Sequence, residues 1–162
     1  MLKSTLSRSA IILIVSLQLT ACMTTQALPD HERPQNWGSV INKQHNLYQI
    51  SPMLYRSEQP NSVFIPELKK NNIDVVINLR SRNKDKMVLA EQNFKLVHIP
   101  INTWAMDRND LLDVMKAIQT AKQQDQKVLI HCYHGSDRTG VSVAMYRIIY
   151  VNWTIDDALN EM

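Results

Sequence analysis

The sequence of 162 residues contains only three glycines and two cysteines, and almost no net charge beyond its first twenty residues. So few cysteines exclude a disulfide-dense scaffold, and a chain of this length buries an adequate core without disulfides. Lys3 and Arg8 precede Cys22 and no acidic residue does, so residues 22–162 carry sixteen basic and fifteen acidic side chains, a net charge of +1. The basic isoelectric point therefore gives no reason to expect a nucleic-acid partner.

The composition, 44% hydrophobic and 20% charged, predicts one ordinary globular domain. No internal repeat and no low-complexity tract interrupts it.

The first 22 residues have the pattern of an export signal. Lys3 and Arg8 form a positive start, the ten-residue run AIILIVSLQL is apolar, and LTAC closes the segment. Ten apolar residues are too few to span a bilayer as a mature helix. LTAC resembles the lipobox of bacterial lipoproteins, which implies a signal peptide over residues 1–21 and lipid modification of Cys22. Met23 follows in place of Asp, and this resemblance favours the outer over the inner membrane, on the periplasmic side.

The remaining chain divides into a tether and a domain. Residues 22–46 are polar, contain Pro29, Pro34 and Gly38, and show no sustained period, which predicts a tether. The domain is expected over residues 47–162. The chain reaches Met162 without a glycine or polar terminator after its last helical pattern, so we expect the natural protein to continue.

Short β-branched runs alternate with amphipathic stretches from Leu47 onward, which predicts an α/β domain with a mainly parallel central sheet of about four to five strands. The runs 46–51 and 53–57 are predicted as an edge pair, and 74–79, 95–100 and 127–132 as strands buried on both faces. Helices are predicted over 62–72, 84–93, 110–124 and 139–153, with a further one after Thr154. In the third, Leu111, Leu112, Met115 and Ile118 share one face and Asp110 is the expected N-cap.

Residues 131–140, HCYHGSDRTG, hold two of the three glycines directly after a predicted strand. A strand, a loop at Gly135 and a helix start leave several backbone N–H groups unpaired and converging at the positive helix end, which predicts an anion cradle of phosphate size. Cys132 opens this cradle, and the N–H donors and helix dipole lower the expected pKa of its thiol. Arg138, six positions later, can fold back and bind two oxygens of the same anion.

This segment resembles the His-Cys-five residues-Arg-Ser/Thr signature of the cysteine-dependent protein tyrosine and dual-specificity phosphatase superfamily. The similarity extends to MLYRSEQP, to VVINLR and to the order of elements, so it covers roughly residues 47–162 and is greatest to the compact bacterial dual-specificity-like branch. It implies a single-domain, phosphatase-type fold. It also implies hydrolysis of phosphorylated proteins or small phosphoesters by a monomer, with no metal and no cofactor.

The resemblance also assigns roles to residues. Cys132 would attack phosphorus, and Thr139 would hydrogen-bond its sulfur when it leaves. Arg138 and the backbone amides of the loop would hold the phosphate oxygens. His131 would orient the loop from below. The loop residues assigned to phosphate binding are Tyr133, His134, Gly135, Ser136, Asp137 and Arg138.

The general acid is less well defined. The family supplies it from an aspartate on the loop before the long helix, here INTWAMDRND, where Asp107 is the first candidate. No Trp-Pro-Asp triplet is present, because Trp104 and Asp107 are three positions apart. Asp110 and Asp137 remain alternatives, the former better explained as a helix N-cap.

Other interpretations stay open. His131, Cys132 and His134 could suggest zinc, but adjacent strand residues face opposite ways and no fourth ligand is evident. A lipoprotein that binds a phosphorylated ligand without turnover would need the same cradle. Arsenate reductases also place Arg after Cys at this spacing, but they carry the loop near the N-terminus and use further cysteines. Arg56 and Arg80, at strand ends, fit either phosphate binding or a solvated rim.

Overall fold

The computed structural model describes residues 28–162. The chain divides into two compact units, Met1–Gln35 and Asn36–Met162. Within the described part of the first unit there is one 3-10 turn, Asp30–Glu32. The predicted signal peptide, residues 1–21, and the predicted lipidation site, Cys22, lie outside the described residues.

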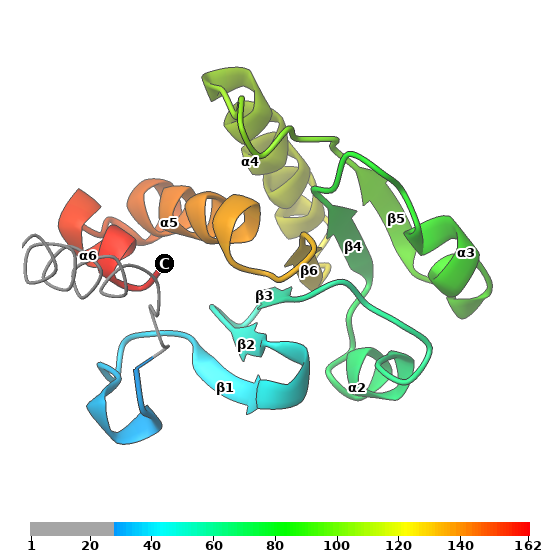
Figure 1. The fold of residues 1–162 in the computed structure, drawn as a ribbon, viewed down its shortest axis with the longest axis horizontal. Coiled ribbons are helices and arrows are strands. Elements are labelled where there is room, and N and C mark those ends of the chain that lie inside the picture. The colour runs from blue at the N-terminus through cyan, green and yellow to red at the C-terminus, as the bar shows by residue number, and fades with distance from the viewer. Residues whose placement is uncertain (1–27) are drawn as a thin grey trace, which may run out of the picture. The chain divides into compact units, whose positions relative to one another are not determined.

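The second unit contains a six-stranded sheet in the order β1-β2-β3-β6-β4-β5 (Figure 1). Strands β3, β6, β4 and β5 are parallel, and β1 and β2 are antiparallel additions at one edge. The prediction of an α/β domain with a mainly parallel sheet is therefore confirmed, with six strands instead of four to five. The strands are β1 Ser39–Asn42, β2 Leu47–Gln49, β3 Leu54–Ser57, β4 Val75–Asn78, β5 Lys95–His98 and β6 Val128–His131.

Two strand predictions need correction. The predicted tether 22–46 is wrong for its last part, because residues 39–42 form β1 and pair with β2, and the compact unit begins at Asn36. The second member of the predicted edge pair is not at an edge, since β3 lies beside β6 with Ser57 opposite His131. The sequence of β1, SVIN, is too short and too polar to be recognised as a strand. Only its backbone pairing with β2 identifies it as one.

The helices occur where the periodicity predicts them; the first two are shorter than predicted, and the next two begin two residues earlier than predicted. They are α2 Ile65–Lys70, α3 Asp85–Leu89, α4 Arg108–Gln123, α5 Asp137–Val151 and α6 Ile155–Asn160; 3-10 turns cover Lys43–His45 and Ala90–Gln92. Thr154 caps α6 by accepting a hydrogen bond from the Asp157 N–H at 3.1 Å. No helix of residues 28–162 is both long and apolar enough to cross a membrane.

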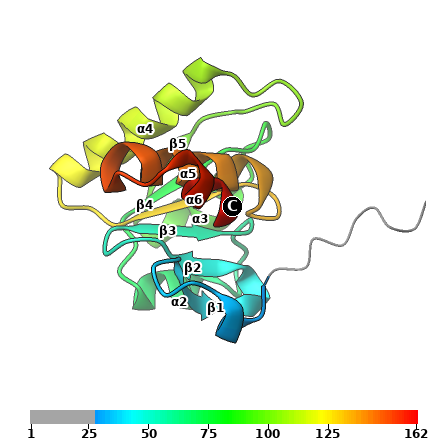
Figure 2. The ribbon, with the colours of Figure 1, turned by 90° about the vertical axis from the view of Figure 1, so that its left-hand side faces the viewer.

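Two hydrophobic cores cover the two faces of the sheet, because successive strand residues point to opposite sides. One core contains Val128, Ile130 and Cys132 from β6 and its end, together with buried residues of α4 and α5. The other contains Leu129 and the buried residues of α2 and α3, among them Leu68 and Leu89. Figure 2 shows α4 and α5 on one side of the strands and α2 on the other. Cys132 and the preceding His131 therefore belong to different faces of the sheet.

Burial also differs from the prediction in two places. β5 is only partly buried because it is the last strand of the sheet and has no neighbour beyond it. The buried face of α4 is Val114, Met115, Ile118 and Ala121, whereas the predicted Leu112 is 45% exposed. Leu111 and Leu112 line an open groove between α4 and α5, so they do not reach the sheet.

Candidate active site

The loop between β6 and α5 is the candidate active site, and it begins at Cys132. β6 is buried along its whole length, and Cys132 follows it with only 3% of its surface exposed. α5 starts at Asp137, so residues 132–136 connect the carboxyl end of a central strand to a helix N-terminus (Figure 1). This is the strand-loop-helix junction that the sequence predicts.

Three donors hold the carbonyl groups of the loop. The Gln59 N–H donates to the Tyr133 carbonyl at 3.1 Å, Asn46 Nδ2 to the His134 carbonyl at 2.8 Å, and Arg56 Nη2 to the Gly135 carbonyl at 2.7 Å. Because the N–H and C=O of a peptide unit point in opposite directions, the loop amides are turned to the other side. Arg56 lies in β3, Gln59 follows β3 and Asn46 precedes β2; of these three, sequence analysis singled out Arg56 alone, and as a possible phosphate contact instead of a support of the loop.

Gly135 is required by this geometry. Its φ of +79° lies in the left-handed region, and a Cβ there would lie 2.5 Å from the Ser57 carbonyl oxygen. The loop therefore passes against the end of β3 at a distance that only glycine permits.

The guanidinium of Arg138 is oriented by the ends of two strands. Its Nη1 donates to the carbonyls of Leu79 and Ile101, at 3.3 and 3.2 Å, just beyond β4 and β5. Its Nε is buried and has no hydrogen-bond partner among the described residues. A buried donor without a partner is costly, so this edge of the guanidinium is suited to an anion in the cradle.

The surroundings of Cys132 favour the thiolate. Burial by itself raises the pKa of the Cys132 thiol, but hydrogen bonds from Thr139 and from the Gly135 amide, with the charge of Arg138, outweigh burial and lower the pKa below its ordinary value. The hydroxyl of Thr139 is buried and makes no other hydrogen bond in the described part of the chain. The structure thus brings Cys132, Thr139 and Arg138 together around one loop.

His131 lies on the opposite face of the sheet from the sulfur and is fully buried. One ring nitrogen, Nε2, is 2.8 Å from Asp85 Oδ2, and the other, Nδ1, is 3.1 Å from the Cys132 carbonyl oxygen. His131 therefore contacts the loop backbone from the side opposite the sulfur and does not line the cradle.

Asp85 is a site residue that sequence analysis missed. It opens α3, is 1% exposed, and accepts a 2.7 Å hydrogen bond from Gln59 Nε2 in addition to its contact with His131. Burial raises the pKa of Asp85. The hydrogen bond and charge of His131 and the hydrogen bond of Gln59 lower this pKa by more than burial raises it, so the net shift is downward. No spacing in the sequence marks this aspartate, because the contact forms only when α3 packs against β6.

The candidate acids need one correction. The N-cap of α4 is Asp107, not Asp110 as predicted: Asp107 Oδ1 accepts the N–H groups of Asn109 and Asp110, and Asp110 Oδ2 accepts the Asp107 N–H in return. Asp107 Oδ2 takes no part in these bonds. Asp137 is exposed in the first turn of α5.

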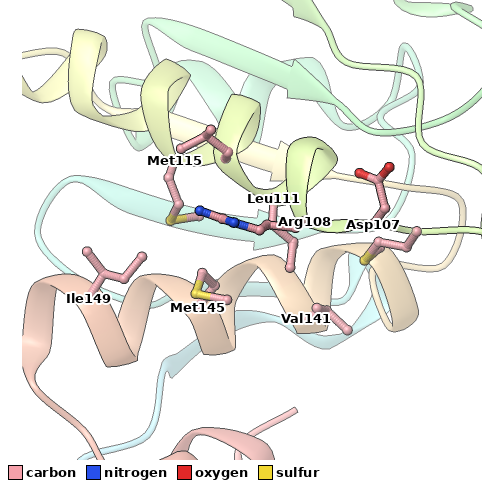
Figure 3. A pocket seen from close by; sticks show the side chains of 9 residues that line it. Asp107, Arg108, Leu111, Met115, Val141, Met145 and Ile149 are labelled. Atoms are coloured by element: carbon pink, nitrogen blue, oxygen red, sulfur yellow. The ribbon is translucent and has the colours of Figure 1, made fainter.

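Asp107 lies at one end of the groove between α4 and α5, which has a volume of about 540 Å³ (Figure 3). Apolar side chains line most of this groove, among them Met106, Met145 and Ile149. Its lining includes no residue of the segment 132–140. The Asp107 carboxylate is turned away from α5 (Figure 3).

The remaining predicted site residues are placed as follows. Tyr133 is 54% exposed, His134 is exposed, and the Arg80 guanidinium lies 4.8 Å from the centre of the Tyr133 ring. Arg56 is buried and donates to the Gly135 carbonyl, so it is not a solvated rim charge. Among residues 28–162, no group of three His, Cys, Asp or Glu side chains is arranged to hold a metal ion.

Comparison with known families agrees with this geometry. The sequence pattern of the family described as "Dual specificity phosphatase, catalytic domain" matches residues 54–162. The chain belongs to this family of cysteine-dependent phosphatases.

Among individual relatives, the chain is 33% identical over 130 residues to the dual specificity protein phosphatase TpbA of Pseudomonas aeruginosa, which covers 80% of this chain and 59% of TpbA. It therefore spans about three fifths of the length of this relative. The mouse protein phosphatase Slingshot homolog 3 is 25% identical over 124 residues, which is 74% of this chain and 18% of that protein.

Solved structures give the same result. A crystal structure of a cysteine-to-serine variant of P. aeruginosa TpbA in complex with pTyr has a TM-score of 0.75 and 32% identity, and the match covers 80% of this chain and 79% of that one. The active form of Tk-PTP, at 22% identity and a TM-score of 0.62 over 72% of this chain and 81% of that one, shares the fold.

Proposed function

We propose that this protein hydrolyses phosphomonoesters, including phosphotyrosine, through a cysteinyl-phosphate intermediate. The observation that carries the proposal is the arrangement around Cys132. Its thiol has a lowered pKa, and the buried Nε of Arg138, beside the same loop, has no partner among the described residues. A dianionic phosphate would satisfy both the loop amides and this guanidinium.

In the first step the Cys132 sulfur forms a bond to phosphorus while the ester oxygen leaves with the electron pair of the broken P–O bond. Arg138 and the loop amides stabilise the negative charge on the three other phosphate oxygens. The leaving oxygen takes a proton from the general acid, for which we propose Asp107 through its Oδ2; this requires the carboxylate, which is turned away from α5 (Figure 3), to swing towards the cradle when substrate binds. In the second step a water attacks phosphorus, and the carboxylate left by the first step takes a proton from that water. The sulfur leaves as thiolate with the hydroxyl of Thr139 beside it.

The nucleophile is tested with 4-nitrophenyl phosphate and a chelator present. We expect turnover by the wild type and a loss of at least about 10³-fold in Cys132→Ser. Phosphate binding by the wild type without any turnover would contradict the proposal and favour a protein that only binds phosphorylated ligands.

Asp107→Asn tests the acid without loss of the helix cap, because asparagine is as good an N-cap as aspartate. We expect kcat to fall about 10²-fold for phenyl phosphate and much less for 4-nitrophenyl phosphate, whose leaving group needs little protonation. Thermal unfolding of the variant should match the wild type. The same leaving-group dependence in Asp137→Asn or Asp110→Asn, and not in Asp107→Asn, would assign the acid to that residue instead.

We also propose that the mature protein is a monomer attached by lipid on Cys22 to the periplasmic side of a bacterial membrane, the outer membrane more than the inner. The support is the charged, apolar and LTAC pattern of residues 1–22. Expression with labelled palmitate should label the protein in the membrane fraction, and Cys22→Ser should remove the label. Sedimentation of the detergent-solubilised protein tests the monomer.

A further inference from the structure

The segment 79–86, which runs from the end of β4 into the first turn of α3, is fixed against the candidate active site at three points. The Leu79 N–H and carbonyl, at its start, bond to the His131 carbonyl at 2.9 Å and to Arg138. Arg80 stacks on Tyr133 of the loop and donates through Nη1 to Gln59 at 2.9 Å. Asp85 at the far end binds His131. The segment therefore borders the cradle on the β4 side.

This segment is strongly basic. It contains Arg80, Arg82, Lys84 and Lys86, and its one acidic residue, Asp85, is buried against His131. Arg82, Lys84 and Lys86 are exposed, and no carboxylate of residues 28–162 lies within ion-pair distance of any of them. Over the whole mature sequence basic and acidic residues nearly balance, so the positive charge beside the cradle is local.

We propose that Arg82, Lys84 and Lys86 form an anion-binding surface that selects phosphorylated peptide segments with carboxylates next to the phosphorylated residue. This inference rests on the proposed function and names the substrate class of the same site. A peptide whose phosphate occupies the cradle passes across the rim, where flanking Asp or Glu side chains meet the three basic residues. The exposed ring of Tyr133 offers an apolar contact to the same segment.

An acidic peptide fits this surface better than an anionic membrane does. The basic residues lie on one short segment that borders the cradle instead of covering a broad face, and Met87 beside them is an exposed apolar side chain. A membrane contact would need several apolar side chains that enter the lipid interface.

The test measures binding in the Cys132→Ser background, so it does not depend on turnover. The ligands are two phosphotyrosine peptides of the same length, one with glutamates and one with glutamines on both sides of the phosphotyrosine. We expect the acidic peptide to bind about tenfold more tightly, which corresponds to about twofold for each exposed charge pair, and the preference to disappear in high salt. With Arg82→Gln, Lys84→Gln and Lys86→Gln combined, the ratio should fall to about one.

A matched control removes three charges near the opposite ends of the strands. Lys69, Lys70 and Lys95 are exposed and lie where β4 and β5 begin, whereas the cradle lies where these strands end. Their combined change to glutamine should leave the tenfold preference intact, which separates a local surface from the effect of net charge.

Equal binding of both peptides by the wild-type surface, or a preference that survives the 82/84/86 substitutions, would overturn the inference. It would also be overturned if the 82/84/86 substitutions abolished binding to phosphatidylglycerol vesicles and left the peptide ratio unchanged, because the surface would then serve a membrane. Failure of the proposed function is a different result: no hydrolysis of 4-nitrophenyl phosphate by the wild type, whatever the binding ratio.

Discussion

At the scale of single residues, the reactivity of Cys132 depends on a few neighbours on one side of the sheet. Thr139 and the Gly135 amide donate to the sulfur and Arg138 adds positive charge, and together they exceed the opposing effect of burial on the pKa of Cys132. Removal of any one of these donors should make the thiolate harder to form.

Thr139→Ala is the test of this balance. The pKa of Cys132 should rise because a hydrogen bond to the thiolate is lost, so alkylation by iodoacetamide should reach half its maximal rate at a higher pH than in the wild type. The modified Cys132 peptide is followed by mass spectrometry, which separates it from Cys22. Ser142→Ala, one turn later in the same helix, removes a bond to the Arg138 carbonyl and should leave this midpoint unchanged.

Asp85→Asn tests the buried pair behind the loop. The pKa of Asp85 in the folded protein is lowered from 3.8, so the ionised carboxylate contributes stability that is present above that pH and lost as pH falls through the folded pKa. We expect the variant to lose about 3 kcal/mol of unfolding free energy at pH 7 by urea titration. The difference from wild type should shrink below pH 4, and a difference independent of pH would contradict the assigned role.

At the scale of elements, the loop and the helices near it show what the sequence could reveal. The strand, loop and helix around Cys132 follow from local signals: an apolar run, a glycine, and a second apolar stretch. Asp107 and Asp110 show the limit, since both fit an N-cap and only the observed start of α4 at Arg108 separates them. Asp85 was not predictable because its role depends on His131, 46 positions away, and β1 was not predictable because its four residues carry no strand pattern of their own and are defined only by their pairing with β2.

Gly135→Ala tests the closeness of the loop to β3. An added Cβ meets both a left-handed φ and the Ser57 carbonyl, so we expect a stability loss of about 3 kcal/mol by thermal unfolding and a loss of phosphatase activity. Asn152→Ala is the matched control, because Asn152 also has a positive φ of 58° but ends α5 at an exposed position. It should cost only about 1 kcal/mol; an equal cost in both variants would mean that the Ser57 contact has no effect.

At the scale of the whole unit, a buried ion pair joins its first and last segments. Glu161, which follows α6, binds Arg147 of α5 through two bonds of 2.6 and 2.7 Å and accepts the Gly38 N–H at 2.5 Å. The Arg147 guanidinium also lies 4.2 Å from the centre of the Trp153 ring. The segment before β1 is thus attached to the helices that follow the catalytic loop.

Glu161→Gln should destabilise the protein by about 3 kcal/mol in urea unfolding, because it leaves the buried Arg147 charge without its partner. The double variant Glu161→Leu with Arg147→Met should recover part of this loss, since it removes both charges together. If the double variant is less stable than Glu161→Gln alone, packing and not the unpaired charge dominates at this site.

The two-sided construction of the catalytic strand has a practical consequence. The reacting sulfur belongs to the core under α4 and α5, while the imidazole that holds its backbone belongs to the core under α2 and α3. A compound that loosened α3 would therefore break the contact of Asp85 with His131 and displace the backbone that positions the sulfur. It would not need to imitate phosphate or compete with substrate. An inhibitor of that kind would avoid the highly charged groups that phosphate mimics require.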